Sequence, residues 1–187
     1  MRRLFVIFFG LFLLTGVLYP LGVSLMGQIF FPQKIHGSLI IENQHILGAK
    51  PIGQSFTKPY YFHGRPSVNR YDGKSSGGSN LALSNPRFLE ALKKRAARLK
   101  KENAEPIPMD MVTASASGLD PHISLDAARF QIARVAKARN ISKNLVEQIL
   151  NTHREDRLFG IFGEEKVNVL LLNLDLDDQQ LGVSDAH

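Results

Sequence analysis

One short stretch of the chain holds the side chains best suited to chemistry. It reads TASASGLDPHIS and brings Asp120 and His122 close to two hydroxyls, Ser115 and Ser117. In a hydrolase, such an aspartate would orient the histidine as a base toward one of the serines. Residues so close in sequence, with Pro121 between the two titratable groups, are also typical of a tight turn whose side chains satisfy its backbone. We favour the turn and keep a hydrolase as the alternative.

A second stretch, SSGGSN over residues 75–80, has the composition of a phosphate-binding loop. Its glycines would let backbone amides approach an anion, and its hydroxyls would add donors. However, no lysine stands in the right register, no helix follows at once, and flexible turns have the same composition. The sequence also lacks the G-x-x-x-x-G-K-[ST], H-E-x-x-H and G-x-S-x-G motifs. We therefore expect no catalytic residue and no metal site in this chain.

Capping residues and hydrophobic spacing predict the elements that position these stretches. Asn85, Ser124 and Ser142 each precede a periodic run and have side chains that cap helices. We expect a strand pair at 38–41 and 45–47 around a turn at 42–44, an irregular loop over 51–84, helices from Pro86 to before Pro106, from Ser124 to Asn140 and from Ser142 to about His153, and a buried strand over 167–176. This pattern predicts one domain of the α/β or α+β class.

The amino-terminal segment from Leu4 to Phe31 has no charged side chain and follows Arg2 and Arg3. It is long enough to cross a hydrocarbon layer of ~30 Å as a helix. The arginine pair favours a cytoplasmic amino terminus. A cleaved signal peptide is the alternative, but its apolar part usually has only ~7–15 residues and ends in an A-x-A-like site, which is missing here. We expect a cytoplasmic start at 1–3, a transmembrane helix at 4–31 and an extracytoplasmic domain at 32–187.

Charge and cysteine content narrow the classes of partner. The net charge is +6, and most of the excess lies between Arg87 and Lys101, while the segment from Glu164 onward is acidic. Such segregation is typical of solvated faces, and no aromatic ladder accompanies the basic run, so we expect no nucleic-acid partner. The chain has no cysteine, which excludes disulfides and cysteine-ligated metal.

Taken in order, several motifs give the chain a resemblance to the C subunit of the Kdp potassium-transporting P-type ATPase. The matching pieces are IGQSF (52–56), YFHGRPS (61–67), YDGKSSGGSNLALSNP (71–86), MVTASASGLDPHIS (111–124), RVAKAR (134–139) and GEEKVNVLLLNLDL (163–176). They cover nearly the whole chain. Departures are small: Ala116 stands where the family tends to have Gly, Leu125 where it has Pro, and Glu165-Lys166 where Pro-Arg is usual.

The resemblance implies a non-catalytic accessory subunit of a complex that imports K⁺ at the expense of ATP. The implied location is the bacterial inner membrane, and the implied partners are a channel-like K⁺-translocating subunit, a P-type catalytic subunit and a small membrane subunit. The phosphorylatable D-K-T-G-T sequence of P-type pumps is absent here. The family is described as raising the ATP affinity of the catalytic subunit. With the domain outside the membrane, we expect no tightly bound cofactor, and ATP to act through the partner.

Two groups of residues are candidate contacts with partners. Small residues of the amino-terminal helix recur at spacings of 4, 3 and 4 and predict a stripe that packs on a partner helix: Gly16, Pro20, Val23 and Gly27. The loops that carry the family motifs are a possible subunit interface: Gly64, Arg65, Pro66, Ser67, Ser76, Gly77, Gly78, Ser79, Asn80, Ser117, Gly118, Asp120, Pro121 and His122.

Overall fold

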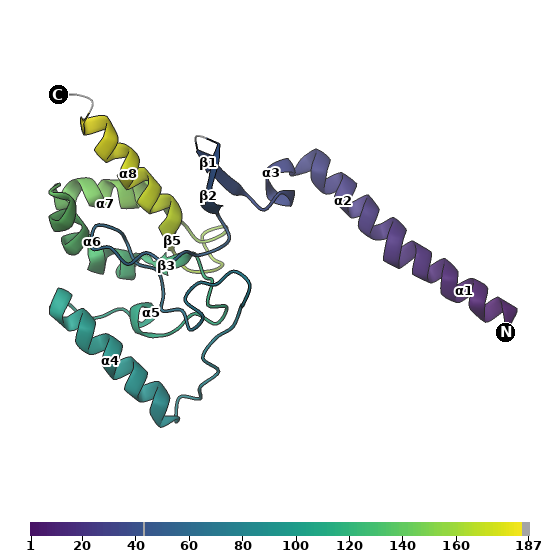
Figure 1. Cartoon of the computed structure of the whole chain (residues 1–187), viewed down its shortest axis with the longest axis horizontal. Coiled ribbons are helices and arrows are strands. Elements are labelled where there is room, and N and C mark those ends of the chain that lie inside the picture. The colour runs from purple at the N-terminus through teal and green to yellow at the C-terminus, as the bar shows by residue number, and fades with distance from the viewer. Residues whose placement is uncertain (43, 185–187) are drawn as a thin grey trace. The chain divides into compact units, whose positions relative to one another are not determined.

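The computed structural model describes residues 1–42 and 44–184, and the chain forms two compact units, Met1–Ala49 and Lys50–His187. Figure 1 shows the elements of both units. Asn43, in the middle of the predicted turn, lies outside the described residues. The first unit therefore contains the predicted transmembrane segment together with the predicted strand pair.

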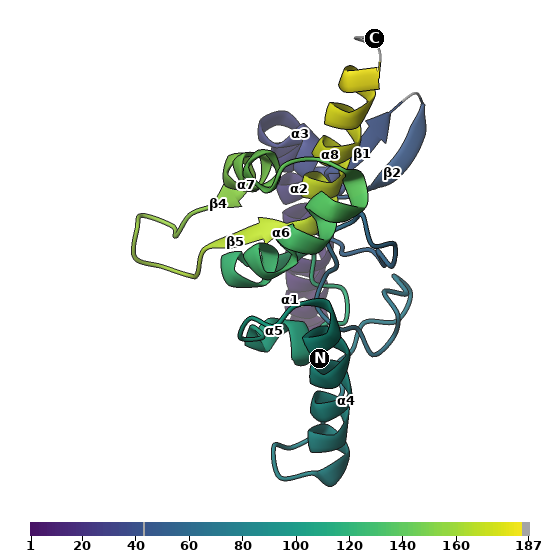
Figure 2. The same cartoon turned by 90° about the vertical axis from the view of Figure 1, so that its left-hand side faces the viewer.

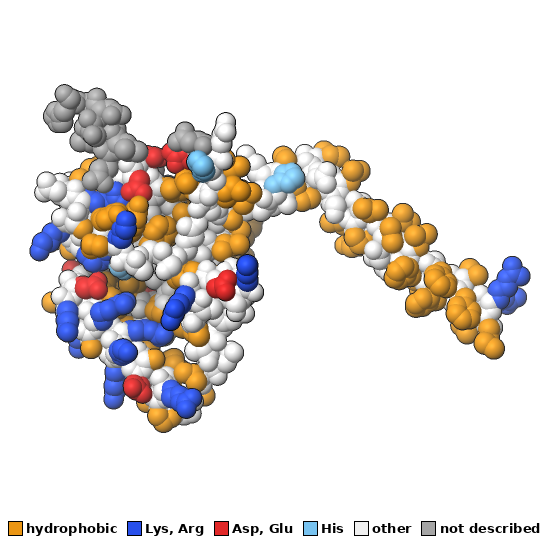
Figure 3. Space-filling view, in the orientation of Figure 1, with side chains coloured by type: hydrophobic (Ala, Val, Ile, Leu, Met, Phe, Trp, Pro, Cys, Tyr) orange, Lys and Arg blue, Asp and Glu red, His pale blue; other side chains and the backbone are white. Residues whose placement is uncertain are grey.

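The first unit begins with a helix that is long and apolar enough to cross a membrane. It runs over Arg2–Phe30, and none of its most apolar stretch is buried. Figure 3 shows hydrophobic side chains along its whole length. It comprises α1 (Arg2–Leu13), a π-helical turn, η1 (Leu14–Leu18), and α2 (Tyr19–Phe30). Length and composition thus agree with a membrane span.

Proline explains the π-helical turn. Pro20 stands in the first turn of α2, has no N–H to donate, and its ring collides with the carbonyl four residues earlier. The Tyr19 N–H instead reaches back five residues to the carbonyl of Leu14, which is the π-helical spacing. The regular advance of ~100° per residue assumed for the predicted stripe is therefore interrupted between Gly16 and Pro20.

A short helix and a hairpin complete the first unit. Helix α3 (Pro32–Ile35) is followed by the antiparallel strands β1 (Leu39–Glu42) and β2 (His45–Ala49). The predicted strand pair is thus confirmed. Gly27 has a neighbour within this unit, because a Cβ added there would lie 3.0 Å from the Cδ1 of Ile35.

Three helices of the second unit begin at residues whose type predicts the start. Helix α4 (Pro86–Glu102) is capped by Asn85, α6 (Leu125–Arg139) by Ser124 and α7 (Lys143–Thr152) by Ser142; each cap side chain accepts a hydrogen bond from a backbone N–H of the first turn. Helix α6 ends at Asn140, whose φ of +57° is the left-handed conformation that closes helices. The three predicted helices are confirmed.

The predicted strand over residues 167–176 is wrong for most of its length. Only β5 (Lys166–Asn168) is extended, and α8 (Val169–Ser184) follows directly. The Asn168 Oδ1 accepts hydrogen bonds from the N–H groups of Leu170 and Leu171 at 3.1 and 3.3 Å, so this side chain begins the helix. The buried positions after it recur at helical spacing: Val169, Leu170, Leu172, Asn173 and Leu176.

The remaining strands form a small antiparallel sheet in the order β3-β5-β4, with β3 at His122–Ser124 and β4 at Arg154–Glu155. His122 pairs with Asn168, and Glu155 pairs with Lys166. A one-turn helix, α5 (Met109–Val112), precedes this sheet. The core lies between the sheet and the helices, and its largest fully buried apolar side chains are Phe62, Ile123, Leu150, Leu172, Leu176, Val135, Val146 and Val167. The second unit is therefore a mixed helix and sheet domain.

Residues 51–85 form a long segment without helix or strand, as predicted; we refer to it as the pinned loop. Two buried amide side chains each bind the backbone of one of its residues through both donor and acceptor. Asn173 accepts from the Phe62 N–H at 2.8 Å and donates to its carbonyl at 3.0 Å. Gln131 does the same at His63, at 2.8 and 3.1 Å. These side chains replace the neighbouring strand that the loop lacks.

A buried arginine holds the loop a few residues earlier. The Arg139 guanidinium, 5% exposed as a residue, donates to the carbonyls of Tyr60 and Leu176 at 2.7 and 2.9 Å and pairs with Asp177 at 2.7 Å. Asp177 also accepts from the Tyr61 hydroxyl at 2.8 Å. The beginning of the pinned loop is thereby tied to the last helix of the chain.

Candidate functional site

The structure brings together the three loops that carry the family motifs. Ser115 donates its N–H to the carbonyl of Pro66 at 2.9 Å, and Ser67 donates its hydroxyl to the carbonyl of Gly118 at 2.8 Å. Gly77 donates its N–H to the carbonyl of Ser117 at 2.8 Å. Segments 64–67, 76–78 and 115–122 therefore form one cluster, which we call the motif cluster.

Two glycines are needed where these loops touch. A Cβ at Gly78 would lie 2.8 Å from the Ala116 carbonyl oxygen, and a Cβ at Gly118 would lie 2.7 Å from that of Gly77. Gly118 also has a φ of +70°, which favours glycine. Ser79 and Asn80 follow Gly78, and Asn80 has a φ of +50°. The glycines of this segment thus serve contact between loops.

Two backbone amides and one hydroxyl of the SSGGSN segment are engaged within the chain. The Ser75 N–H donates to the Asp72 carbonyl at 3.0 Å, and the Gly77 N–H is taken by Ser117. The Ser76 hydroxyl donates to the same Ser117 carbonyl at 3.1 Å. A phosphate cradle needs such donors to converge on the anion, so this geometry supports the turn interpretation.

The hydroxyls near Asp120 and His122 stabilise the turn as well. Ser115 Oγ accepts from the Gly118 N–H at 3.2 Å, and Ser117 Oγ accepts from the Leu119 N–H at 3.1 Å. Asp120 Oδ1 accepts from the His122 N–H at 3.0 Å. The two serine hydroxyls also contact each other, with Ser115 Oγ and Ser117 Oγ 3.2 Å apart. This contact joins two hydroxyls and pairs neither of them with a base.

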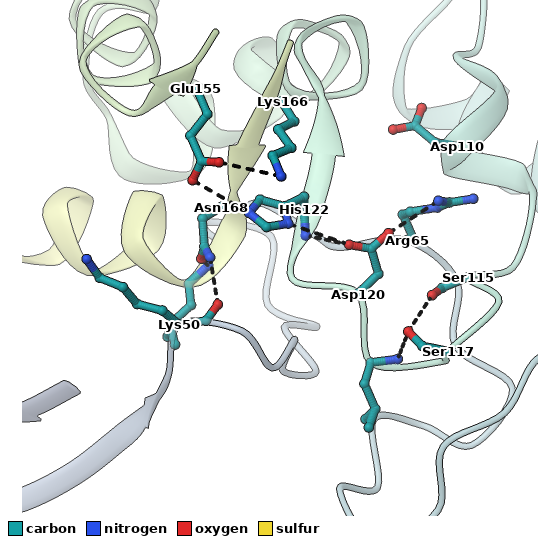
Figure 4. A network of polar contacts seen from close by, with 12 residues as sticks. Lys50, Arg65, Asp110, Ser115, Ser117, Asp120, His122, Glu155, Lys166 and Asn168 are labelled. Atoms are coloured by element: carbon teal, nitrogen blue, oxygen red, sulfur yellow. Dashed lines mark hydrogen bonds and ion pairs between the residues drawn. The ribbon is translucent and has the colours of Figure 1, made fainter. Parts of the chain in front are cut away.

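The imidazole of His122 lies between two carboxylates instead of facing a serine (Figure 4). Its Nδ1 is 3.8 Å from Asp120 Oδ1, and its Nε2 is 3.6 Å from Glu155 Oε1. Glu155 also pairs with Lys166 at 3.6 Å, and Asp120 with Arg65 at 3.3 Å. A chain of polar contacts through His122 thus links the motif cluster to the edge strand β4.

The carboxyl of Asp120 is held in its charged form. Burial raises its pKa, but the hydrogen bonds from His122 and the charge and hydrogen bond of Arg65 outweigh burial and leave the pKa below its ordinary value. Next to this pair, burial first and the charge of Asp120 second raise the pKa of Tyr71 to about 12. The Tyr71 hydroxyl donates to the carbonyl of Arg65 at 2.5 Å. These groups form a structural ion-pair network.

A polar hollow of about 400 Å³ opens beside this network and is lined by Arg65, Asp110, Asp120, His122, Ile123, Ser124, Glu164, Glu165 and Lys166. Asp110 closes one side, where its carboxylate accepts from the Ser124 N–H at 2.8 Å and from its hydroxyl at 3.2 Å. Arg65 Nε is buried without a hydrogen-bond partner in the described structure. Among residues 1–42 and 44–184, no group of three His, Cys, Asp or Glu side chains is placed to hold a metal ion.

The sequence prediction missed part of this network. Asp110, Glu155 and Lys166 lie 10 to 46 positions from Asp120 in sequence, and only strand pairing brings the last two together. Their pairing could have been found only with the correct register of β4 and β5. The charge-rich stretch around an apolar pentapeptide, REDRLFGIFGEEK, was a visible signal that the prediction did not use.

The apolar helix and the contacts of the second unit describe a candidate membrane-anchored protein with structural polar networks. Within residues 1–42 and 44–184, no serine contacts the imidazole of His122. The family model described as "KdpC: K+-transporting ATPase, c chain" matches residues 1–178. A potassium-transporting ATPase KdpC subunit of Polynucleobacter asymbioticus is 48% identical over 183 residues, 95% of this chain and 97% of the relative. The KdpC subunit of Koribacter versatilis is 47% identical over 170 residues, 89% of this chain and 88% of the relative.

The chain belongs to the KdpC family. This agrees with the resemblance given by the sequence motifs, and it supports the accessory subunit over the hydrolase alternative.

Proposed function

We propose that this chain is a membrane-anchored accessory subunit of an ATP-driven potassium import complex. Helix Arg2–Phe30 spans the bilayer, with the amino terminus in the cytoplasm and the second unit on the extracytoplasmic side of a bacterial inner membrane. The observation that carries the proposal is this exposed apolar helix in a chain of the KdpC family. Its apolar side chains need either lipid or other helices around them.

The proposed partners are a channel-like K⁺-translocating subunit, a P-type catalytic subunit and a small membrane subunit. The chain stabilises their assembly and supports the catalytic subunit, including its affinity for ATP. Because the second unit lies across the membrane from cytoplasmic ATP, it contacts no nucleotide and acts through its partners. The turn geometry at Ser115 and Ser117 supports this non-catalytic role.

The absence of cysteine makes the orientation directly testable. One variant carries Leu83→Cys in the second unit, and another carries a cysteine inserted after Met1. In intact spheroplasts, a membrane-impermeant maleimide should label the first variant and not the second. Labelling of the second variant alone would refute the proposed orientation.

The helix stripe has its own test with a matched control. Gly16→Leu places a bulky side chain on the predicted stripe, where an added Cβ meets only the Phe12 ring at 3.7 Å. Gly10→Leu makes the same change at a glycine that is not part of the predicted stripe, where nothing lies within 4 Å of an added Cβ. We expect Gly16→Leu to weaken retention of partner subunits in the detergent-purified complex and Gly10→Leu to leave it unchanged. Equal retention would make the helix an anchor only.

A further inference from the structure

The middle of the connection between β4 and β5 consists of five residues, Leu158–Phe162, which we call the apolar tip. Its four large side chains are exposed: Leu158 63%, Phe159 84%, Ile161 73% and Phe162 65%. Figure 2 shows that this connection projects away from the sheet and helices of its unit. Apolar side chains gathered in this way mark interaction sites on soluble domains.

The apolar tip keeps its shape through its own backbone. Leu158 and Phe162 pair in both directions, with N–H to carbonyl distances of 2.8 and 3.0 Å. The Gly160 N–H donates to the Arg157 carbonyl at 3.0 Å. Phe159, with a φ of +54°, and Gly160, with +73°, make the turn that points the aromatic side chain outward. Phenylalanine is uncommon in this conformation, and a tip formed in advance loses little entropy when it binds.

The residues on either side of the apolar tip, 154–157 and 163–166, form what we call the stem. The charges of the stem favour a protein over a lipid surface as the partner of the tip. Residues 154–166 hold four carboxylates and three cations outside the tip. Arg154 is already paired with Asp156 at 2.6 Å and with Glu165 at 2.8 Å, and Lys166 is paired with Glu155. Membrane-inserting segments instead surround apolar residues with excess Lys and Arg, which anionic headgroups attract.

The polar hollow shares residues with the stem that carries the apolar tip. Glu164, Glu165 and Lys166 line the hollow and also belong to the stem. The hollow adds two further carboxylates, Asp110 and Asp120, with one further cation, Arg65, to the stem charges. An apolar centre beside a polar, mostly acidic rim has the composition of a protein interface, and its charge calls for a basic partner surface.

We propose that the apolar tip inserts into an apolar groove with a basic rim on another subunit of the potassium-transporting complex. This proposal rests on the proposed function. It assigns the most specific contact of the second unit to Phe159 and Ile161. The motif cluster and the hollow then lie at the edge of the same interface.

Photo-crosslinking in the intact complex identifies what touches the tip. p-Benzoylphenylalanine replaces Phe159 in one variant and Leu83, which is 79% exposed, in the control. A product at position 159 that joins this chain to another subunit of the purified complex, and is missing at position 83, supports the proposal. Crosslinking to lipid, to a second copy of the chain or to nothing would overturn it, as would equal products at both positions.

A retention assay measures how much the contact matters. We expect Phe159→Asp with Ile161→Asp to reduce recovery of the partner subunits on the tagged full-length chain by about tenfold or more. Leu83→Asp should leave recovery near wild type. If the wild-type chain retains no subunit, the proposed function fails and the tip proposal with it. If wild type and tip variant retain subunits equally, the tip proposal alone fails.

Discussion

Two irregular segments of the second unit differ in what holds them. The pinned loop contains Phe62, which is fully buried, and side chains from α6 and α8 bind its backbone. The apolar tip has its large side chains in solvent, and its backbone hydrogen bonds join residues 157–162 to one another. The comparison shows that an irregular segment bound by buried amides belongs to the fold, whereas one that satisfies only itself is available to a partner.

The strongest test of the pinned loop removes one of its buried amides. Asn173→Leu leaves the N–H and carbonyl of Phe62 buried without partners, so we expect the free energy of unfolding to fall by about 2–4 kcal/mol. Urea unfolding of the full chain in detergent, followed by circular dichroism, measures this loss. Asn151→Leu, at an exposed position of α7, is the control and should change the free energy by less than about 0.5 kcal/mol. Equal effects would show that Phe62 is not held by this amide.

A smaller loss should follow from separating the loops of the motif cluster. Gly118→Ala places a methyl group 2.7 Å from the Gly77 carbonyl oxygen at a φ of +70°. We expect destabilisation by about 1–3 kcal/mol in the same assay. Gly77→Ala is the matched control, since an added Cβ there has nothing within 4 Å. A neutral Gly118→Ala variant would mean that the cluster can open without cost.

The pinned loop should also respond to alkaline pH through Tyr71. The pKa of this phenol is raised from 10.0 to about 12, so its contribution to stability is present below pH 10 and is lost as pH rises through 12. The slope of the unfolding free energy against pH reports how many protons the folded and unfolded states differ by. Tyr71→Phe should reduce that difference by up to about one proton between pH 10 and 12. Absorbance titration at about 295 nm of the wild-type chain checks the phenol directly. An unchanged pH dependence in the variant would show that Tyr71 is solvated.

The apolar tip should give the smallest effect on folding. Phe159→Asn suits the left-handed backbone and removes no buried contact, so we expect a change within about 0.5 kcal/mol. A large loss of stability would place the tip within the fold and remove the contrast with the pinned loop. A stable variant that loses its partner subunits would sharpen that contrast.

Local signals predicted much of the fold. A helix cap depends only on residues that are neighbours in sequence. Asn85, Ser124 and Ser142 were predicted as caps, and each is observed as one. The strand predicted over residues 167–176 is wrong because a high density of Val and Leu occurs in buried helices as well as in buried strands. Asn168 also has the residue type of a cap, and buried positions 169, 172, 173 and 176 follow a helical period.

The candidate site was less accessible to sequence reasoning. The residues of the motif cluster were named, but their mutual contacts join positions about fifty apart, such as Ser67 and Gly118, and no local pattern encodes such pairs. The same holds for the amides that bind Phe62 and His63, which come from 111 and 68 positions further along. Spacing predicts faces of helices, whereas contacts of this range depend on the assembled topology.

The tie between Arg139, Tyr60 and α8 has a consequence for biosynthesis. Tyr60 and Phe62 of the pinned loop are held by Asn173 and, through Arg139, by the Leu176 carbonyl and the Asp177 carboxylate, all of which are synthesised much later than the loop. A nascent chain that has emerged only as far as α7 still lacks half of this clamp. The loop can therefore be held in place only after α8 has emerged, and until then its residues depend on chaperones or on the assembling complex for protection.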